Sequence, residues 1–308
     1  MKKVLILYGS ASYEHDISLL SMNTIKENID YSIYDVTFCY IDKENNWYQD
    51  DLFIEDVTSY VKKFDVVFPV IHGNYGEDGK LEGMFDFLNV KYVGSKTEAS
   101  VLSFDKDITK IICDKYNIPQ VNYFSLYKGQ QIDLDKVKYP VIIKPARCGS
   151  SIGISVANNE EQLLSSIEDA FKYDNKIIIE DFLNVRELEC SVIYDNGFKT
   201  GQIGEIVSCN QFYDYDAKYE KDSKIIIPAN IDKEIEDKIK KYSILISNIL
   251  EIESYARVDF LLDENNNLYF NEINTIPGFT NISMFLKLLI GDKYKIKDII
   301  TTLIENAL

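Results

Sequence analysis

Residues 255–274 read YARVDFLLDENNNLYFNEIN. Two apolar segments, 255–262 and 268–273, flank the polar turn 263–267, and this pattern predicts a β-hairpin. Three side chains with oxygen atoms interrupt the apolar strands: Asp259, Glu272 and Asn274. Mg²⁺ prefers such ligands in proteins, and phosphate oxygens usually complete its shell. The hairpin therefore indicates a magnesium–phosphate site, although a solvated hairpin with ordinary surface acids would show the same residues.

Strand register decides whether the polar side chains of this hairpin meet. Alternate residues of a strand share a face, so Arg257 lies on the same side as Asp259, and Glu272 on the same side as Asn274. A slip of one residue between the two strands would place these pairs on opposite faces. The sequence leaves both arrangements open.

The first third of the chain alternates short strands with helices. Strands are predicted at 4–8, 34–41 and 64–71, and helices at 17–29 and 81–88. This alternation is typical of an α/β fold with a parallel sheet. Ligands bind such sheets at the carboxyl ends of the strands, and two loops occupy such ends, 9–15 and 72–79.

A glycine-rich loop follows a strand in the middle of the chain. Residues 139–144 are strand-like and end in Lys144, and the loop PARCGSSIG follows at 145–153. Such a loop can hold phosphate oxygens through backbone N–H groups and hydroxyls. The loop is not a P-loop, because it lacks the GxxxxGK[ST] pattern. It also lacks GxGxxG, so a Rossmann dinucleotide site is not supported. A flexible turn is an equally good interpretation of this loop taken alone.

Three domains are expected, over residues 1–95, 96–183 and 184–308. The second is expected to begin with a single helix over 96–116, which stops before Pro119. Further strands are predicted on either side of the boundary between the last two domains, at 177–183, 187–194 and 199–207.

The composition excludes several classes of protein. Counting 33 Lys and Arg against 50 Asp and Glu gives a formal net charge of −17 over 308 residues. A chain this acidic lacks the basic face that binds nucleic acid or an anionic membrane. No apolar run approaches the roughly 18 residues of a transmembrane helix. Five scattered cysteines without CxxC spacing indicate a reduced, cytoplasmic protein, and the absence of GxSxG argues against a serine hydrolase.

Seven motifs, taken in order, resemble the D-alanine–D-alanine ligases, which are ATP-grasp enzymes. They are EHDIS at 14–18, HGNYGEDG at 72–79, Asp105-Lys106 with Lys110, KPARCGSSIG at 144–153, YDYDAKY at 213–219, ARVDF at 256–260 and NEINTIPGFT at 271–280. The resemblance implies an α/β ATP-grasp fold in which the central and C-terminal domains clasp ATP. It also implies a cytoplasmic homodimer that makes the D-alanyl-D-alanine of peptidoglycan from D-alanine and ATP, with two Mg²⁺ or Mn²⁺ ions.

The resemblance assigns one set of residues to ATP and metal. The residues expected at ATP are Lys106, Lys144, Gly149, Ser150, Ser151, Glu180, Phe182, Leu183, Glu187 and Lys218. Among them, Lys106 and Lys144 correspond to lysines on the phosphates and Glu187 to the acid on the ribose. The expected metal ligands are the three hairpin residues Asp259, Glu272 and Asn274.

A second set is assigned to the amino-acid substrates. The residues expected to bind D-alanine are Glu14, His72, Lys218, Tyr219, Arg257, Gly278, Ser283 and Met284. Catalytic roles are implied for Glu14, Ser150, Tyr219, Arg257 and Gly278. In this interpretation Arg257 and the Gly278 N–H form the oxyanion site, and the aromatic segment 213–219 acts as a lid. A packed surface loop is the alternative for that segment.

Other activities remain open at this stage. The nearest alternative is a relative that makes D-alanyl-D-serine or D-alanyl-D-lactate. Related resistance-type ligases often carry Arg where this chain has Met284, and lactate-specific ones tend to carry His in place of Tyr219, so D-alanine is the expected acceptor. The loop YGSASYEHD lacks the two adjacent glycines usual in the family, and Phe285-Leu286 replace its usual Tyr-Pro. A remote alternative is an inactive ATP-binding module that only docks a partner.

Overall fold

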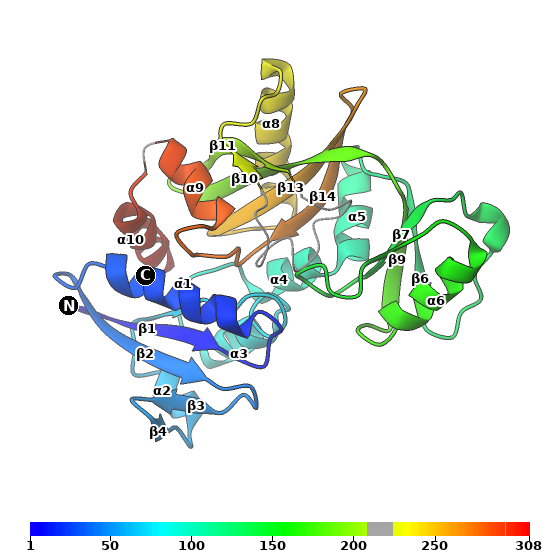
Figure 1. The fold of residues 1–308 in the computed structure, drawn as a ribbon. Helices are drawn as coiled ribbons and strands as arrows, with labels where there is room; N and C mark the ends of the chain where they lie inside the picture. The colour runs from blue at the N-terminus through cyan, green and yellow to red at the C-terminus, as the bar shows by residue number, and fades with distance from the viewer. Residues whose placement is uncertain (208–223, 293) are drawn as a thin grey trace.

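Three β-sheets, covered by helices, make up the part of the chain that the computed structural model describes, residues 1–207, 224–292 and 294–308 (Figure 1). The predicted lid residues Lys218 and Tyr219 lie outside these ranges. The architecture is of the α/β class, as expected, and each sheet is built largely from one third of the sequence.

The N-terminal sheet is parallel at its centre, as the alternation of strands and helices predicted. Its order is β4 (Leu52–Phe53), β3 (Trp47–Gln49), β2 (Tyr34–Ile41), β1 (Lys2–Gly9) and β5 (Val66–Pro69). Strands β1, β2 and β5 run parallel, whereas the short edge strands β3 and β4 are antiparallel additions that the sequence analysis did not predict.

Alternate residues of β1 point to opposite faces of this sheet, and helices cover both faces. Val4 and Ile6 share a core with α1 (His15–Asn28) and α10 (Ile296–Ala307). Leu5 and Leu7 share another with α2 (Val57–Val61) and α3 (Lys80–Leu88). Burial on both faces explains why β1 is a continuous apolar run.

The central sheet is antiparallel and lies apart from the rest, on the right in Figure 1. Its order is β6 (Tyr123–Tyr127), β9 (Lys176–Asp181), β7 (Val141–Pro145) and β8 (Ser155–Ala157). Helix α6 (Glu160–Ala170), which the sequence analysis did not predict, packs Leu163 and Ile167 against Ile143 and Ile177. The short 3₁₀ helix η1 (Leu134–Lys136) precedes β7.

The C-terminal sheet is antiparallel and contains the predicted hairpin. Its order is β12 (Lys224–Ile226), β11 (Phe198–Val207), β10 (Val185–Tyr194), β13 (Tyr255–Asp263) and β14 (Leu268–Asn274). Helix α8 (Lys233–Ile249) packs against the same core as β10, β11 and β13, and α9 (Met284–Gly291) packs on β10 and β11. Gly204 makes the close approach of α9 possible, because a Cβ there would lie 2.3 Å from the Met284 methyl group.

The single helix predicted over 96–116 is wrong, because the chain breaks at Asp105 into α4 (Thr97–Phe104) and α5 (Lys106–Lys115). Asp105 is extended (φ −87°, ψ 99°), and its side chain accepts a hydrogen bond from the Ile108 N–H at 3.2 Å, which caps α5. Ala99 of α4 and Cys113 of α5 share the core of the C-terminal sheet. The domain boundaries stay a prediction.

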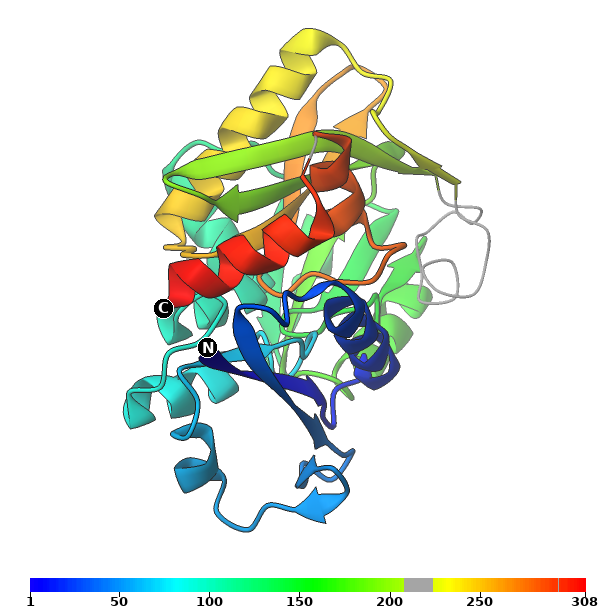
Figure 2. The same cartoon turned by 90° about the vertical axis from the view of Figure 1, so that its left-hand side faces the viewer.

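The ends of the chain lie close together in both views (Figures 1 and 2). Helix α10 lies between the N-terminal and C-terminal sheets, and its Leu303 shares one core with Val4 of β1 and Tyr255 of β13.

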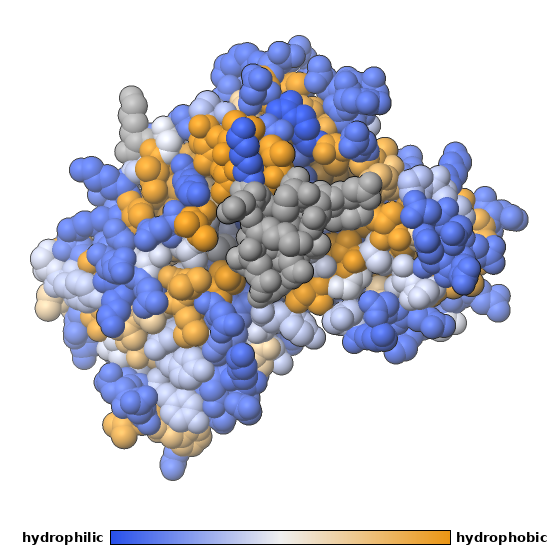
Figure 3. All heavy atoms as spheres, viewed as in Figure 1, coloured by the Kyte–Doolittle hydropathy of each residue, from blue (hydrophilic) through white to orange (hydrophobic). Residues whose placement is uncertain are grey.

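Among the described residues, no helix is long and apolar enough to cross a membrane. On the face drawn in Figure 3, hydrophilic residues predominate at the outer parts of the molecule and hydrophobic ones gather nearer its middle.

Candidate active site

Two adjoining cavities lie where the three sheets meet, with volumes of about 320 and 480 Å³. The smaller lies between the central and C-terminal sheets, and the larger lies between the N-terminal loops and the C-terminal sheet. The wall that both cavities share is formed by Lys106, Cys148, Gly149, Ser150, Glu189, Arg257 and Glu272.

The two predicted residue sets line these two cavities, and some members of each set line both. Around the smaller cavity lie all described residues predicted for ATP: Lys106, Lys144, Gly149, Ser150, Ser151, Glu180, Phe182, Leu183 and Glu187. Around the larger cavity lie all described residues predicted for the amino acids: Glu14, His72, Arg257, Gly278, Ser283 and Met284. Ser150, predicted for ATP and for catalysis, lines both cavities. Lys218 and Tyr219 are outside the described residues.

The register of β13 and β14 brings the polar side chains of the hairpin to one side. Asp259 lies opposite Glu272, and Arg257 lies opposite Asn274. The Asn274 amide donates to Asp259 at 3.1 Å, and the Arg257 guanidinium donates to both oxygens of Asp259 at 2.8 and 2.7 Å. The register that the sequence left open is therefore the one that lets these groups act together.

The hairpin donors fit a hard divalent cation that is shared with phosphate. Asp259, Glu272 and Asn274 offer carboxylate and amide oxygens from adjacent strands, as Mg²⁺ or Mn²⁺ requires. Within residues 1–207, 224–292 and 294–308, no group of three or more His, Cys, Asp or Glu side chains could hold a metal by itself. Mg²⁺ is commonly held in this way, by one or two carboxylates with phosphate oxygens and water completing its shell.

Glu189 is a site residue that the sequence analysis missed. It lies on β10 directly opposite Asp259, so three carboxylates follow one another across β10, β13 and β14. Its Oε2 lies 3.0 Å from Arg257 Nε. Burial acts to lower the pKa of Arg257, but Asp259 and Glu189 outweigh it and hold that pKa well above its ordinary value. A charged residue inside the apolar strand 187–194 was the signal in the sequence.

The two lysines predicted for phosphate are already held by carboxylates. Lys106 Nζ lies 3.1 Å from Glu272 Oε2 and donates to the Cys148 carbonyl at 2.8 Å. Lys144 Nζ lies 2.5 Å from Glu180 Oε2, and Lys110 Nζ lies 2.7 Å from the other Glu180 oxygen. Burial acts to raise the pKa of Glu180, but the two lysines lower it to about 2. The Glu180 side chain thus orients Lys144 in addition to lining the smaller cavity.

The glycine-rich loop meets the N-terminal unit at Glu14. The Ser150 hydroxyl donates to Glu14 Oε1 at 2.5 Å. The other Glu14 oxygen, Oε2, lies close to two glycines. A Cβ added to Gly73 would be only 2.7 Å from it, and a Cβ added to Gly149 would be 3.3 Å from it. Two glycines from distant loops therefore leave the space in which this carboxylate faces the cavity.

His72 lines the larger cavity, but both of its ring nitrogens contact protein groups. Nδ1 lies 2.7 Å from the Ile276 carbonyl, and Nε2 lies 2.8 Å from the Ser21 hydroxyl. The imidazole therefore orients the chain after β14 in addition to facing the place expected for D-alanine. The residue is 2% exposed, which leaves little of it available to a substrate.

The opposite rim of the larger cavity is made by the segment that leads into α9. The Ser283 hydroxyl accepts from the Thr280 N–H at 3.0 Å, and a Cβ on Gly278 would lie 2.9 Å from that hydroxyl oxygen. Met284, the first residue of α9, is buried and packs with Ile206 and Leu288. This rim is therefore apolar at Met284 and polar at Ser283.

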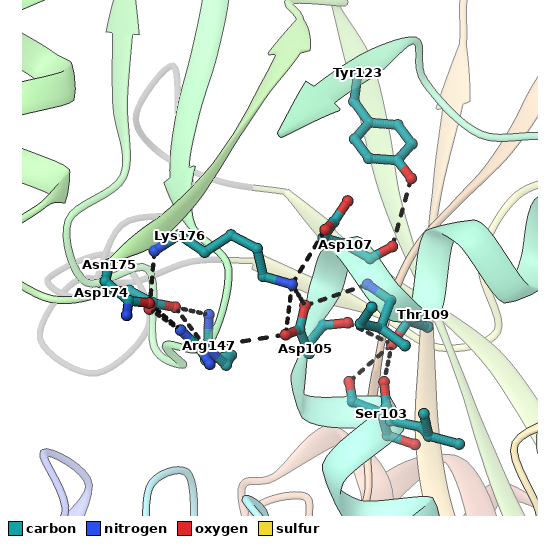
Figure 4. Close-up of polar contacts among 11 residues, drawn as sticks. Ser103, Asp105, Asp107, Thr109, Tyr123, Arg147, Asp174, Asn175 and Lys176 are labelled. Atoms are coloured by element: carbon teal, nitrogen blue, oxygen red, sulfur yellow. Dashed lines mark hydrogen bonds and ion pairs between the residues drawn. The ribbon is translucent and has the colours of Figure 1, made fainter. Parts of the chain in front are cut away.

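A buried ion network anchors the start of α5 beside the site (Figure 4). Lys176 of β9 lies 2.7 Å from Asp105 and 3.1 Å from Asp107. Arg147, at the base of the glycine-rich loop, pairs with Asp174 at 2.5 Å. Because Lys106 lies between the two aspartates in sequence, this network fixes the position from which that lysine reaches the site.

The fold and the site define an ATP-grasp enzyme, since two antiparallel sheets enclose a lysine-lined cavity whose wall carries facing carboxylates. The family model described as "D-ala D-ala ligase C-terminus" matches residues 112–305, and the one described as "D-ala D-ala ligase N-terminus" matches residues 3–59 and 51–95. The chain belongs to the D-alanine–D-alanine ligase family.

Similar proteins support this membership. A D-alanine–D-alanine ligase of Clostridium novyi is 38% identical, covering 99% of this chain and 98% of its own. One of Clostridium acetobutylicum is 39% identical with the same coverage. Among solved structures, the VanG D-Ala:D-Ser ligase of Enterococcus faecalis has a TM-score of 0.89 at 29% identity, covering 100% of this chain and 99% of its own. D-alanyl-alanine synthetase A of Vibrio cholerae has 0.87 at 28% identity, covering 99% and 98%.

Proposed function

We propose that this protein joins two D-alanines into D-alanyl-D-alanine for peptidoglycan synthesis, through a D-alanyl phosphate, with release of ADP and phosphate. The observation that carries this proposal is the shared wall of the two cavities. A nucleotide in the smaller cavity would present its terminal phosphate at Lys106, Ser150 and Glu272, where an amino acid in the larger cavity can reach it. A carboxylate does not condense with an amine unaided, because its oxygen is a poor leaving group, and transfer of a phosphoryl group from ATP converts that oxygen into a phosphate that can leave.

In the first step the carboxylate of one D-alanine attacks the terminal phosphate. The Lys106 and Lys144 ammonium groups would stabilise the charge that develops on the phosphoryl oxygens, and the loop with Gly149 and Ser150 would add N–H and hydroxyl donors. Mg²⁺ bound by Asp259, Glu272 and Asn274 would supply further charge stabilisation on those oxygens. Glu14 would hold the ammonium group of this first D-alanine, because its carboxylate faces the larger cavity.

In the second step the amine of the other D-alanine attacks the activated carbonyl. Arg257 and the Gly278 N–H would stabilise the tetrahedral oxygen, since both line the larger cavity. The attacking amine must be neutral, so use of the acceptor should improve above neutral pH. Water must be kept from the acyl phosphate, and the aromatic segment with Lys218 and Tyr219 is our candidate for that role.

D-alanine is the acceptor that the larger cavity favours, with D-serine as the alternative. Met284 lines the larger cavity and packs among aliphatic side chains, and this apolar surface suits the methyl of D-alanine. A serine hydroxyl placed against it would lose its hydrogen bonds with water and gain none from Met284. Similarity to a D-Ala:D-Ser ligase structure keeps the alternative worth testing.

A homodimer in the cytoplasm is also proposed. Support comes from the family resemblance and, for the compartment, from reduced cysteines, because the four within the described residues are free and buried. Sedimentation at micromolar concentration tests the dimer, and a monomer would overturn it.

The activity is tested by measuring phosphate release with ATP and Mg²⁺ in the presence of single amino acids. We expect release with D-alanine, little with D-serine and none with L-alanine, which serves as the matched control. Release that requires no amino acid would overturn the ligase mechanism. If no D-amino acid causes phosphate release but the protein still binds ATP, the result would favour an ATP-binding interaction module.

A further inference from the structure

The chain that follows β14 is held by side chains of the N-terminal unit. Glu77 Oε2 accepts hydrogen bonds from the N–H groups of Thr275, at 2.9 Å, and Ile276, at 3.0 Å. These residues lie two and three positions before Gly278, whose N–H faces the larger cavity in the proposed mechanism. Glu77 is buried, so both hydrogen bonds are shielded from water and hold the backbone firmly.

A second contact holds the same segment from the other side. His72 Nδ1 lies 2.7 Å from the Ile276 carbonyl, which can only accept, so this nitrogen carries the proton. Its Nε2 then accepts from the Ser21 hydroxyl at 2.8 Å. That hydroxyl oxygen in turn accepts from the Phe279 N–H at 3.1 Å. Gly278 thus lies between two residues whose backbone groups are fixed by the N-terminal unit.

A glycine turn places the Glu77 carboxylate for this task. The Glu77 N–H donates to the Gly73 carbonyl at 2.8 Å, and the Gly73 N–H donates to Glu77 Oε1 at 2.7 Å. Gly76 is required in the turn, because a Cβ there would lie 1.8 Å from the Ile71 carbonyl oxygen. One carboxylate oxygen is therefore used by the N-terminal loop and the other by the chain after β14.

We propose that Glu77 is a positioning residue for the ligation step, which ties the chain after β14 to the N-terminal loop so that the Gly278 N–H points at the tetrahedral oxygen. Ser21 and His72 complete this tie from the other side. The inference rests on the proposed function, because it assigns Glu77 to one step of that reaction. It predicts that loss of the tie slows attack by the amine more than formation of the acyl phosphate.

Glu77→Gln tests this inference, because an amide keeps one acceptor oxygen and replaces the other with an NH₂ group that cannot accept. We expect kcat for the dipeptide to fall roughly 100-fold, as for a misplaced oxyanion donor, with the KM for ATP within about twofold of wild type. When attack by the amine is slow, more of the acyl phosphate is hydrolysed by water. The molar ratio of phosphate released to dipeptide formed should therefore rise above one. Glu82→Gln, at a nearby buried carboxyl on α3, is the kinetic control and should keep the wild-type kcat, KM for ATP and ratio of phosphate to dipeptide.

The ratio of phosphate to dipeptide separates positioning from a merely structural role. If Glu77→Gln lowers the rate and the melting temperature while the ratio stays at one, the inference is overturned. If this variant does not fold, Ser21→Ala decides, since it removes the acceptor of the Phe279 N–H and should raise the ratio in a folded protein; an unchanged ratio there overturns the inference. Wild-type protein that makes no dipeptide at all would instead refute the proposed function.

Discussion

Each charged side chain at the shared wall of the two cavities has a partner of opposite sign. Lys106 pairs with Glu272, and Arg257 pairs with Asp259 and with Glu189. These contacts hold the side chains in place without a ligand, because a buried charge is tolerated only when it is paired. A nucleotide phosphate and its metal can replace these partners without leaving a charge unpaired.

The metal assignment is tested by Glu272→Gln, which keeps the shape of the side chain and removes its charge. We expect kcat to fall by at least roughly 100-fold, because a ligand that helps to stabilise the transferring phosphate is lost. The fold should survive, since this side chain is 29% exposed. Dipeptide formation and thermal unfolding, measured on the same sample, check both expectations.

Glu264→Gln, in the exposed turn of the same hairpin, is the matched control and should change neither quantity. Wild-type turnover in Glu272→Gln would remove this residue from the metal site.

The buried carboxyl of Glu82 should make the unfolding free energy of the protein depend on pH. It is buried on α3, and its Oε2 has no hydrogen-bond partner among the described residues. Burial raises its pKa from 4.5 to about 8. Because the pKa in the folded state is the higher one, the stability that this group contributes is complete below pH 4.5 and is lost as the pH rises through 8.

Glu82→Gln should therefore gain stability relative to wild type as the pH rises. Between pH 5 and pH 8.5 the difference in unfolding free energy should grow in favour of the variant by roughly 2–4 kcal/mol. Urea unfolding at the two pH values measures it. An equal difference at both values would show that the Glu82 carboxyl does not titrate in this range.

At the level of elements, the break between α4 and α5 depends on the ion network of Figure 4. Asp105 caps α5 and also pairs with Lys176, which lies 71 residues further along the chain. Lys176 is 3% exposed and has Asp105 and Asp107 within 3.1 Å. The start of α5, and with it Lys106, is therefore attached to the central sheet.

Lys176→Met should destabilise the protein, because two buried aspartates lose their partner. Breaking a buried pair in this way costs about 3–5 kcal/mol in unfolding free energy. Lys172→Met is the control, since Lys172 is 68% exposed and pairs with the exposed Asp169, and it should change stability by less than about 1 kcal/mol. Urea unfolding at pH 7 compares the two, and equal effects would contradict the account of this network.

Periodicity alone was enough to predict several of the elements. Strands β1, β2 and β5, helices α1 and α3 and the hairpin of β13 and β14 all show clear apolar patterns, and the structure confirms them. The break at Asp105 could not be predicted, because the apolar pattern continues through it and Lys176, its partner, is remote in sequence. The short strands β3 and β4 carried too little pattern to be predicted, whereas helices α6 and α10 each bury one apolar face and were missed.

At the scale of the whole molecule, the site depends on contacts between residues far apart in sequence. Ser150 meets Glu14 across 136 positions, and Thr275 meets Glu77 across 198. The motifs could be identified because polar and glycine residues interrupt apolar segments there, as Arg257 and Asp259 do within β13. Their assembly, the hairpin register and the contributions of Glu189 and Lys110 required the three-dimensional structure.

The central claim is that one reaction takes place across both cavities, and product analysis tests it most directly. The protein is incubated with ATP, Mg²⁺ and a mixture of D-alanine, D-serine and D-lactate, and the products are identified by mass spectrometry. The account predicts D-alanyl-D-alanine as the main product, with one ADP formed per dipeptide. A main product that contains D-serine or D-lactate would contradict the acceptor assignment, and ADP without any condensed product would contradict the ligase itself.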